Sequence, residues 1–448
     1  MECTKPLEVF FLHKIFGTDG VRGIANLELT TELLTKIGRA VALVLSPFGG
    51  KILIGKDTRI SSDVLEYALV SGIASAGSNP VMLGVVPTPA VSFLTKSSQS
   101  NSAGVMISAS HNSFEFNGIK IFNSEGYKLD DETQSRIEDL ILNDFENVKV
   151  PVADKIGKIF YEKYYVNQYI NHIKPILKDN DLKVVFDCAN GTACRFVAKI
   201  FKNRKNFVSI FDSPNGLNIN ENCGSTNLAS LSKFVINNGF DLGIAFDGDA
   251  DRCLAVDENG EIIDGDHIIA ALAIDTKKDG NLKHDTVIGT HMANMGLSEF
   301  LEKSKINFLQ TKIGDRFISE KMNETGAVLG GEQSGHIICS EYSETGDGLI
   351  TAVMLINLVS KIEKSSEITK MFKKYPQFTK NIKIEKEVDL LEDSRFKDLI
   401  KRLDKLLYDC GRVFVRKSGT EPLIRIMCEA KSFKKLKEAE KEIEDSLI

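Results

Sequence analysis

Residues 242–256 read Leu-Gly-Ile-Ala-Phe-Asp-Gly-Asp-Ala-Asp-Arg-Cys-Leu-Ala-Val. Two short apolar runs, 242–246 and 253–256, flank a turn in which three aspartates alternate with glycine and alanine. Short apolar runs that end at turn residues are typical of buried strands. The stretch therefore predicts two strands joined by a tight acidic loop.

A short β-branched run followed by a longer segment of helical period recurs along the chain, which indicates α/β layers around parallel sheets. Three units share this design. The expected strand and helix of each unit are 51–55 with 62–76, 182–187 with 193–202, and 285–289 with 296–304. Their spacing of roughly a hundred residues predicts three related α/β domains in tandem.

The pattern changes after about residue 370. A helix, two strands at 412–416 and 423–428, and a highly charged last helix predict a smaller α+β domain there. The length of 448 residues is enough to bury several cores. We therefore expect four domains, at 1–150, 151–255, 256–370 and 371–448.

Composition narrows the functional classes. The chain carries 56 basic and 62 acidic residues and no basic run, so nucleic acid is not an expected partner. No stretch of roughly 18 apolar residues occurs, so neither a transmembrane helix nor a membrane partner is expected. The apolar run at 9–12 is too short for a signal peptide. The eight cysteines are scattered without a zinc-binding spacing, which indicates free thiols in a reducing cytoplasm.

The first of four candidate chemical sites is the stretch 104–112, in which an apolar strand runs into small and hydroxyl residues. This tight turn can present Ser110 as a nucleophile, provided that a base or a metal-bound phosphate assists the hydroxyl. His111 is adjacent in sequence, and we expect it to turn to a different side, so no Ser-His dyad is assigned. The alternative is an ordinary turn rich in serine and asparagine.

The second candidate site is the acidic loop. Asp247, Asp249 and Asp251 can converge on one side of it, and their oxygens suit a hard cation such as Mg²⁺ that keeps positions open for phosphate. A bound cation would relieve the repulsion among three close carboxylates. One alternative is an EF-hand calcium loop, but Arg252 stands where that loop needs glycine, and the flanks are expected to be strands. The other alternative is a solvated acidic turn.

The third candidate site is Gly-Gly-Glu-Gln-Ser-Gly-His at 330–336. Its glycines let the backbone approach a ligand, and Glu332, Ser334 and His336 alternate so that they can point the same way. An acceptor, a hydroxyl and a titratable ring suit the hydroxyl groups of a sugar. The alternative is a glycine-rich hairpin with a structurally satisfied histidine.

The fourth candidate site is Arg-Lys-Ser-Gly-Thr-Glu-Pro at 416–422, together with Arg425. Backbone amides near the glycine, two hydroxyls and two guanidinium groups can bind a phosphate dianion, because arginine matches phosphate oxygens two at a time. The alternative is a basic hairpin turn.

These four stretches, preceded by Phe-Gly-Thr-Asp-Gly-Val-Arg-Gly at 16–23, resemble the motifs of the α-D-phosphohexomutase superfamily. The resemblance runs essentially from end to end of the chain. Within the superfamily, the stretches 331–335 and 417–423 are similar to the branch of bacterial phosphoglucosamine mutases. The resemblance implies a heart-shaped molecule of three related α/β domains and a smaller fourth one, with the active site in the central cleft.

The resemblance also implies roles for individual residues. Ser110 would be the phosphorylated serine, with Ser108 in support. One Mg²⁺ would be bound by four residues: Ser110, Asp247, Asp249 and Asp251. Glu332 and Ser334 would hold sugar hydroxyls. The substrate's phosphate would be bound by five residues: Arg416, Ser418, Gly419, Thr420 and Arg425.

The implied reaction interconverts glucosamine 6-phosphate and glucosamine 1-phosphate, which would feed UDP-N-acetylglucosamine and cell-wall synthesis. Phosphoserine donates its phosphoryl group to the free hydroxyl, the 1,6-bisphosphate turns around in the cleft, and the serine takes back the other phosphate. Arg22 and Arg252 would neutralise charge, and Lys120 and His336 are both candidates for moving the hydroxyl proton. Closure of the fourth domain would exclude water. The resemblance further implies glucose or glucosamine 1,6-bisphosphate as activator and, by analogy, a homodimer.

Two features depart from the resemblance. Ser113 stands where proline usually follows the asparagine, so the loop is expected to be less rigid and turnover lower, and the segment 1–14 is longer than the usual start. Three rival functions stay open. They are a phosphomannomutase or phosphoglucomutase of the same superfamily, a metal-dependent sugar phosphatase in which water attacks the phosphoserine, and a non-catalytic sensor of sugar phosphates.

Overall fold

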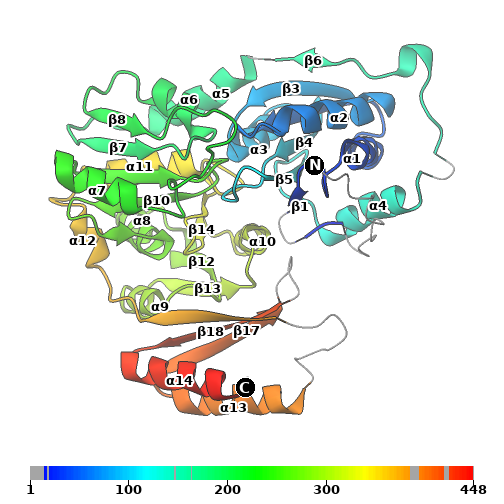
Figure 1. The fold of residues 1–448 in the computed structure, drawn as a ribbon. Coiled ribbons are helices and arrows are strands. Elements are labelled where there is room, and N and C mark those ends of the chain that lie inside the picture. The colour runs from blue at the N-terminus through cyan, green and yellow to red at the C-terminus, as the bar shows by residue number, and fades with distance from the viewer. Residues whose placement is uncertain are drawn as a thin grey trace, which may run out of the picture.

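The structure is a computed structural model, and it describes residues 15–17, 20–145, 148–162, 164–383, 393–417 and 423–446. Four β-sheets follow one another along the chain, and we number them sheets I to IV. Sheets I, II and III form the body of the molecule with their helices, and sheet IV lies beneath the body in the view of Figure 1. The predicted architecture of three related α/β domains and a smaller fourth domain is confirmed.

Sheet I has the strand order β1-β5-β4-β2-β3-β6. Its strands are β1 (Val21–Ile24), β2 (Lys51–Lys56), β3 (Asn79–Val85), β4 (Asn101–Ile107), β5 (Phe116–Asn123) and β6 (Phe160–Tyr161). Its helices are α1 (Thr31–Leu45), α2 (Ser62–Ser75), α3 (Thr88–Lys96) and α4 (Asp131–Leu142). Helices α1, α2 and α4 share one apolar core through Leu34, Leu69 and Ile137, while α3 packs into the core of the rest of the body.

Sheets II and III are smaller, with the strand orders β11-β10-β9-β7-β8 and β13-β12-β14-β15. Sheet II consists of β7 (Val184–Asp187), β8 (Phe207–Ile210), β9 (Leu242–Phe246), β10 (Cys253–Asp257) and β11 (Ile262–Ile263), with helices α5 (Tyr164–Ile173), α6 (Ala193–Ile200) and α7 (Ala229–Asn238). Sheet III consists of β12 (Thr286–Thr290), β13 (Asn307–Thr311), β14 (Leu329–Gly331) and β15 (Ile337–Cys339), with helices α8 (Gly265–Lys278), α9 (Met295–Lys303), α10 (Asp315–Thr325), α11 (Gly348–Val359) and α12 (Ser366–Thr369).

Sheets I, II and III repeat one topology. A first central strand pairs in parallel with a second strand on one side and with a third strand on the other. A fourth strand then runs antiparallel to the third. In chain order these strands are β2 to β5, β7 to β10, and β12 to β15. The expectation of parallel sheets thus holds for three strands of each repeat, and the connection from the third to the fourth strand is an equivalent place in all three.

Two short strands fall beyond predicted domain boundaries. Strand β6 pairs with β3 in sheet I and β11 pairs with β10 in sheet II, although they follow residues 150 and 255 respectively. The boundaries themselves stay a prediction.

Sheet IV is antiparallel, with the strand order β16-β18-β17. It consists of β16 (Gln377–Lys383), β17 (Gly411–Lys417) and β18 (Leu423–Ala430), with helices α13 (Ser394–Leu407) and α14 (Phe433–Ser446). The sequence pattern misses β16, because its side chains alternate between half-buried and exposed and include two lysines and an asparagine. Such a strand contains no apolar run.

The apolar interior is divided between the body and sheet IV. One core runs through sheets I, II and III and includes Leu53, Phe186 and Leu329. Sheet IV has a core of its own, in which α13 contributes Leu403 and α14 contributes Ile443. Within the described ranges, no helix is both long and apolar enough to cross a membrane.

Hydrogen bonds and an ion pair join the body to the domain of sheet IV. Arg412 on β17 donates from Nη2 to the carbonyl oxygen of Ala293, and the backbone nitrogen of Met295 donates to Glu429 Oε1 on β18 at 2.9 Å. Lys431, which follows β18, pairs with Glu299 on α9 at 2.7 Å. These polar contacts lie between two separate apolar cores, one in the body and one in the fourth domain.

Candidate active site

The connection from the third to the fourth strand carries a predicted chemical motif in each of the three repeats. We name these connections the serine loop, the aspartate loop and the glutamate loop. They span residues 108–115 between β4 and β5, residues 247–252 between β9 and β10, and residues 332–336 between β14 and β15.

The three loops meet in space. The hydroxyl of Ser110 donates to Asp247 Oδ2 at 2.5 Å, which joins the serine loop to the aspartate loop. Where the aspartate loop ends, the backbone nitrogen of Cys253 donates to the carbonyl oxygen of Gly335 in the glutamate loop at 2.9 Å. Three motifs that lie about 80 residues or more apart in the chain therefore form one site.

Ser110 occupies an unusual backbone conformation. Its φ is +52°, a region that residues with a side chain rarely adopt. Its side chain is buried against the aspartate loop, and its backbone nitrogen donates to Ser108 Oγ at 2.9 Å. Ser108 thus supports the backbone of Ser110, and the reactive role of Ser110 stays a prediction.

The side chain of His111 lies closer to Ser110 than expected. Its Nδ1 is 3.4 Å from Ser110 Oγ, so the expectation that adjacency would turn the ring away is wrong. The left-handed backbone at Ser110 accounts for the difference, because neighbouring side chains alternate faces only in an extended strand. Burial, together with the charges of Arg252 and Arg22, lowers the pKa of His111 to about 4, so its ring is neutral at pH 7.

The three aspartates present carboxylate oxygens that all lie within 4.8 Å of one another. Asp247 and Asp249 are fully buried and Asp251 is 3% exposed, which excludes a solvated acidic turn. The flanking elements are the strands β9 and β10, which excludes the helix pair of an EF-hand.

The charges of these aspartates are unevenly balanced. Burial and the two neighbouring carboxylates raise the pKa of Asp247 well above its usual value. Burial acts in the same direction on Asp251, but Lys120 and His336 outweigh it and hold the pKa of Asp251 well below the usual range. One oxygen of Asp249 and one of Asp251 are buried and accept no hydrogen bond from a described residue. Oxygens of this kind fit a hard divalent cation, which takes oxygen ligands.

Two side chains from the domain of sheet I complete the surroundings of the aspartates. Lys120 on β5 donates from Nζ to Asp249 Oδ2 at 2.7 Å and to Asp251 Oδ2 at 2.6 Å. Thr88, the first residue of α3, donates from its hydroxyl to Asp249 Oδ2 and from its backbone nitrogen to the carbonyl oxygen of Asp249. The sequence motifs point to Lys120 but give no signal for Thr88.

His336 lies between two carboxylates. Its Nδ1 is 3.8 Å from Asp251 Oδ1 and its Nε2 is 3.1 Å from Asp315 Oδ2. Burial alone would lower the pKa of His336, but the charges of Asp315 and Asp251 outweigh it and raise the value to about 10.

The glutamate loop brings its two predicted sugar ligands together. Glu332 accepts from the backbone nitrogen of Gly314 at 3.1 Å through one oxygen and from Ser334 Oγ at 3.3 Å through the other. Both side chains are half-buried, so they are more accessible than the aspartates. The pair can exchange its mutual hydrogen bond for hydrogen bonds to a ligand.

Arg416 and Arg425 face each other across β17 and β18 and are half-buried. Burial and the charge of Arg425 lower the pKa of Arg416, and Glu332 in the glutamate loop opposes the shift. Two guanidinium groups at adjacent strand positions suit a phosphate dianion. The other three predicted phosphate ligands lie outside the described residues: Ser418, Gly419 and Thr420.

Arg22 and Arg252 are the remaining predicted residues. Arg22 lies on β1, where it pairs with Gly118 of β5. Arg252 ends the aspartate loop, and its backbone nitrogen donates to Asp247 Oδ1 at 3.2 Å. The charges of both guanidinium groups reach His111, so both lie close to the serine loop.

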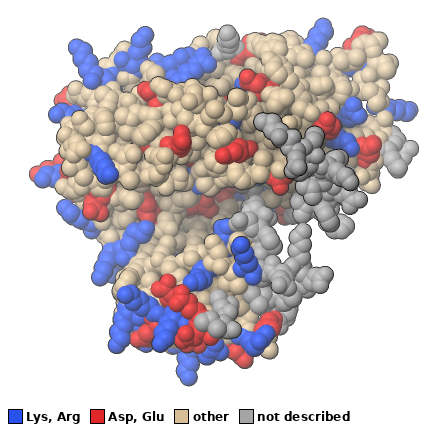
Figure 2. All heavy atoms as spheres, in the orientation of Figure 1, with Lys and Arg blue, Asp and Glu red and all other residues tan. Residues whose placement is uncertain are grey.

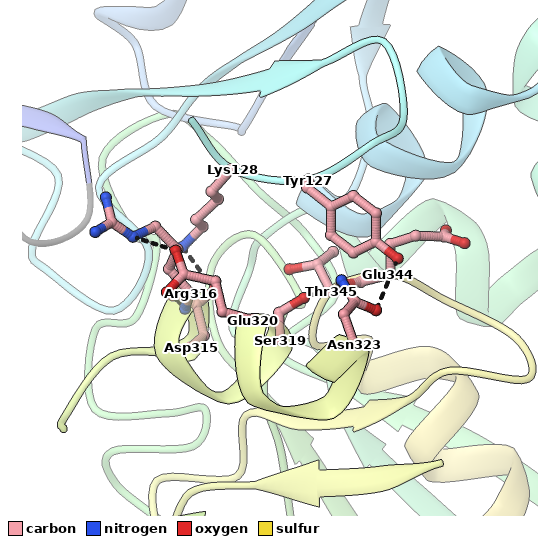
Figure 3. A pocket seen from close by; sticks show the side chains of 9 residues that line it. All are labelled: Tyr127, Lys128, Asp315, Arg316, Ser319, Glu320, Asn323, Glu344 and Thr345. Carbon is pink, nitrogen blue, oxygen red and sulfur yellow. Dashed lines mark hydrogen bonds and ion pairs between the residues drawn. The ribbon is translucent and has the colours of Figure 1, made fainter. Parts of the chain in front are cut away.

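The molecular surface is hollowed between the body and the domain of sheet IV, and acidic side chains are visible inside the hollow (Figure 2). A separate polar cavity of about 70 Å³ flanks the site, between α10 and the loop that contains Tyr127 and Lys128 (Figure 3). Lys128 pairs there with Asp315 at 2.7 Å, and Tyr127 donates to Asn323 at 3.3 Å. This cavity touches the site through Asp315, the partner of His336.

Sequence analysis also misses Arg59 and Asn220, which hydrogen-bond backbone oxygens of the serine loop. Arg59 and Thr88 follow the parallel strands β2 and β3, and the serine loop follows the parallel strand β4. Ligands of open α/β sheets bind at the carboxyl ends of the strands, so this shared edge is the signal that could have identified Arg59 and Thr88.

Four family models match the chain in order. They describe phosphoglucomutase/phosphomannomutase alpha/beta/alpha domain I at residues 13–148, domain II at 164–260, domain III at 264–375 and the C-terminal domain at 377–446. Among curated proteins, the phosphoglucosamine mutase of Acetivibrio thermocellus is 47% identical over 93% of this chain and 95% of its own. That of Clostridium kluyveri is 48% identical over the same shares.

Solved structures show the same fold. A phosphoglucomutase/phosphomannomutase family protein from Burkholderia thailandensis superposes with a TM-score of 0.79 at 24% identity, over 97% of this chain and 96% of its own. An N-acetylphosphoglucosamine mutase from Aspergillus fumigatus, in complex with GlcNAc-6P and magnesium, superposes with a TM-score of 0.67 at 17% identity, over 96% and 95%.

Proposed function

The chain belongs to the phosphoglucomutase/phosphomannomutase family, and from this premise we propose that it acts as a phosphoglucosamine mutase. It is an isomerase that interconverts glucosamine 6-phosphate and glucosamine 1-phosphate. The observation that carries the proposal is the hydrogen bond from Ser110 to Asp247, inside a buried cluster of three aspartates. A phosphomannomutase or phosphoglucomutase is less favoured, because relatives of 47% and 48% identity over 93% of the chain are named phosphoglucosamine mutases.

We propose that the aspartate loop holds one Mg²⁺. The residues that would bind it are Ser110 through its phosphate, Asp247, Asp249 and Asp251. The buried oxygens of Asp249 and Asp251 that accept no hydrogen bond from a described residue support this assignment. When bound, the cation would neutralise charge on the phosphoryl group.

The proposed chemistry begins with a phosphate on Ser110. The bond from phosphorus to Ser110 Oγ breaks as a bond to the free hydroxyl of the sugar phosphate forms, and the hydroxyl gives up its proton. Lys120 or His336, in its uncharged form, would take up this proton and return it in the second transfer, and both side chains lie beside Asp251. After the bisphosphate has turned around, Ser110 takes the other phosphate and the product leaves. Arg22 and Arg252 supply positive charge beside the serine loop.

The substrate is held from the other two domains. Glu332 and Ser334 are the proposed partners of the sugar hydroxyls, and their half-buried position supports that role. The phosphate that does not react would be bound in the domain of sheet IV, by Arg416, Ser418, Gly419, Thr420 and Arg425.

Four further points belong to the proposal. Glucose or glucosamine 1,6-bisphosphate would load Ser110 with phosphate, and the product would feed UDP-N-acetylglucosamine and cell-wall synthesis. The protein would act in the cytoplasm, in agreement with the free thiols of the seven described cysteines, and as a homodimer. The four domains would divide near residues 150, 255 and 370.

A comparison of substrates tests the proposal. Initial rates are measured on glucosamine, glucose and mannose phosphates with Mg²⁺ and glucose 1,6-bisphosphate present. We expect the highest kcat/KM for glucosamine phosphate, and intact mass with site mapping should show one phosphate, on Ser110. A clear preference for mannose phosphate contradicts the assignment of the sugar. Release of inorganic phosphate at the rate of isomerisation would favour the phosphatase, and full isomerase activity of Ser110→Ala would remove the mechanism altogether.

A further inference from the structure

Arg59 lies fully buried beneath the serine loop. It follows β2, and its Nε donates to Asp57 Oδ2 at 2.8 Å in an ion pair in which neither side chain is exposed. The other oxygen of Asp57 accepts from Ser62 Oγ at 2.8 Å, so the carboxylate is itself held in place. A buried guanidinium group is costly unless all its donors find partners. The orientation of Arg59 is therefore determined by its surroundings.

The remaining donors of Arg59 all point to the backbone of the serine loop. Nη2 donates to the carbonyl oxygens of Ser110 at 3.0 Å and Asn112 at 2.8 Å, and Nη1 donates to that of Ser113. A planar guanidinium group offers these donors in a rigid fork, which the single ammonium of a lysine does not.

A second group holds the same oxygens from another domain. Asn220, in the connection between β8 and α7, donates from Nδ2 to the carbonyl oxygens of Ser110 and Asn112, each at 2.9 Å. Its own backbone nitrogen donates to the carbonyl oxygen of Ala189 at 2.9 Å. The carbonyl oxygens of Ser110 and Asn112 are thus each bound by two side chains, one from the domain of sheet I and one from that of sheet II.

This arrangement explains how Ser110 keeps its strained backbone. A serine at a φ of +52° persists only where its surroundings outweigh the cost of that conformation, and the loop has serine rather than a rigid proline at position 113. Holding the carbonyl oxygens fixes the backbone of the loop and with it the direction of the Cα–Cβ bond of Ser110, from which Oγ reaches to 2.5 Å from Asp247.

We propose that Arg59 and Asn220 are positioning residues that hold the serine loop in its reactive conformation across the boundary between two domains. Arg59 is too deeply buried to touch a substrate, so its effect passes entirely through the backbone of the loop. The inference rests on the proposed function, since it concerns the alignment of Ser110 for phosphoryl transfer.

The first test is Arg59→Lys, which keeps the charge opposite Asp57 and removes the fork. Small errors in the alignment of reacting groups cost up to about 100-fold in rate. We therefore expect kcat to fall about 10- to 100-fold while KM for the sugar phosphate changes less than about twofold. Hydrogen exchange should accelerate at 108–115 and stay unchanged in sheets III and IV. The matched control is Arg204→Lys, because Arg204 also binds one carboxylate and one carbonyl oxygen, at 2.7 and 3.1 Å, outside the site.

The second test is Asn220→Gly, which removes the amide and suits the φ of +59° at that position. Asp57 keeps Arg59 as its buried partner in this variant. Asn220→Gly therefore tests the role of the loop even if Arg59→Lys fails to fold. We expect a fall in kcat of about 3- to 10-fold at constant KM, with faster exchange at 108–115. Wild-type kcat in both variants, or an equal rise in exchange throughout the protein, overturns the inference. Failure of the proposed function looks different, because the wild-type protein itself would then not isomerise glucosamine phosphates.

Discussion

The aspartate loop and the glutamate loop occupy equivalent places in two copies of one topology, yet their surroundings differ. Asp247, Asp249 and Asp251 are buried, and side chains from a neighbouring domain, among them Lys120, cover them. The glutamate loop is half-open, and Glu332 contacts groups of its own domain.

The difference shows how one scaffold serves two tasks. In the aspartate loop, another domain covers the connection after the third strand. The carboxylates of this loop therefore lie in a buried, charged environment, which suits the transfer of a phosphoryl group. Where the connection is left half-open, the same backbone position can exchange its hydrogen bonds with a ligand. We therefore expect changes at the covered loops to lower kcat and changes at the open loop to raise KM.

The largest effect is expected from Ser110→Ala. The variant lacks the oxygen that would carry the phosphate, so isomerase activity should fall at least about 1,000-fold. Intact mass after exposure to glucose 1,6-bisphosphate should show no added phosphate. Ser108→Ala is the matched control, since Ser108 only accepts a hydrogen bond from the Ser110 backbone, and it should lose less than about 10-fold. Equal losses in the two variants would contradict the distinction.

Removal of the metal, or of one of its proposed ligands, ranks next. Exhaustive chelation should abolish activity and Mg²⁺ should restore it, because three buried carboxylates need a cation to bind a phosphate near them. Asp249→Asn should lower kcat about 100-fold or more and weaken Mg²⁺ binding measured by calorimetry. Asp275→Asn, which removes a carboxylate that pairs with Lys361 on the surface, should change neither. Full turnover in the presence of chelator would leave the aspartate loop without its proposed role.

A smaller effect, of a different kind, is expected at the open loop. Glu332→Gln keeps the shape of the side chain and removes its charge, so KM for glucosamine phosphate should rise about 10-fold while kcat falls less. Saturation kinetics separate the two quantities. Glu320→Gln on α10 is the control, because Glu320 is half-exposed and pairs with Arg316. A fall in kcat of Glu332→Gln with unchanged KM would contradict the proposed difference between the covered aspartate loop and the half-open glutamate loop.

The smallest effect concerns pH. Asp266 supports the glutamate loop by accepting from Gln333 at 3.1 Å, and burial together with the charge of Asp264 raises the pKa of Asp266 to about 7. An unfolded aspartate loses its proton near pH 3.9, so the unfolded state binds fewer protons than the folded one between about pH 4 and 7. Stability should therefore decline as pH rises through this window, by at most on the order of 4 kcal/mol.

Asp266→Asn cannot titrate, so it should lack this part of the decline. Urea unfolding at pH 5 and pH 8 measures the difference for the wild type and the variant, and KM at the two pH values should differ by only a few-fold. An identical loss of stability in both proteins would show that Asp266 does not titrate in this range.

Much of the fold follows from local pattern. Each repeat begins with a short apolar strand and an amphipathic helix, and the predicted ranges 51–55 and 62–76 agree with β2 and α2. The strand β16 escapes prediction because an edge strand with lysines has no apolar run to detect. Strand prediction from apolar runs fails for a strand such as β16, because its side chains are not buried and need not be apolar.

The candidate site likewise contains residues that local sequence predicts and residues that it does not. Ser110 and the three aspartates stand out because small and charged residues interrupt strands, which is visible within ten residues of sequence. Their meeting, and the contributions of Arg59, Thr88 and Asn220, depend on contacts between segments that are 50 to 160 residues apart. His111 shows the remaining limit, since a single positive φ at the preceding residue reverses where its ring points.

The polar contacts between the body and the domain of sheet IV have an energetic consequence. Displacing any of the first three domains would bring leucine and phenylalanine side chains into water, whereas displacing the fourth uncovers carbonyl, carboxylate and guanidinium groups that water solvates well. Exchanging a protein hydrogen bond for one to water costs only about 0.5–1.5 kcal/mol, or about 1.5–3 kcal/mol where a charged group takes part. We therefore expect the last domain to swing aside at a lower free-energy cost than any of the other three, and such a motion would give a sugar bisphosphate room to turn over while the rest of the protein stays folded.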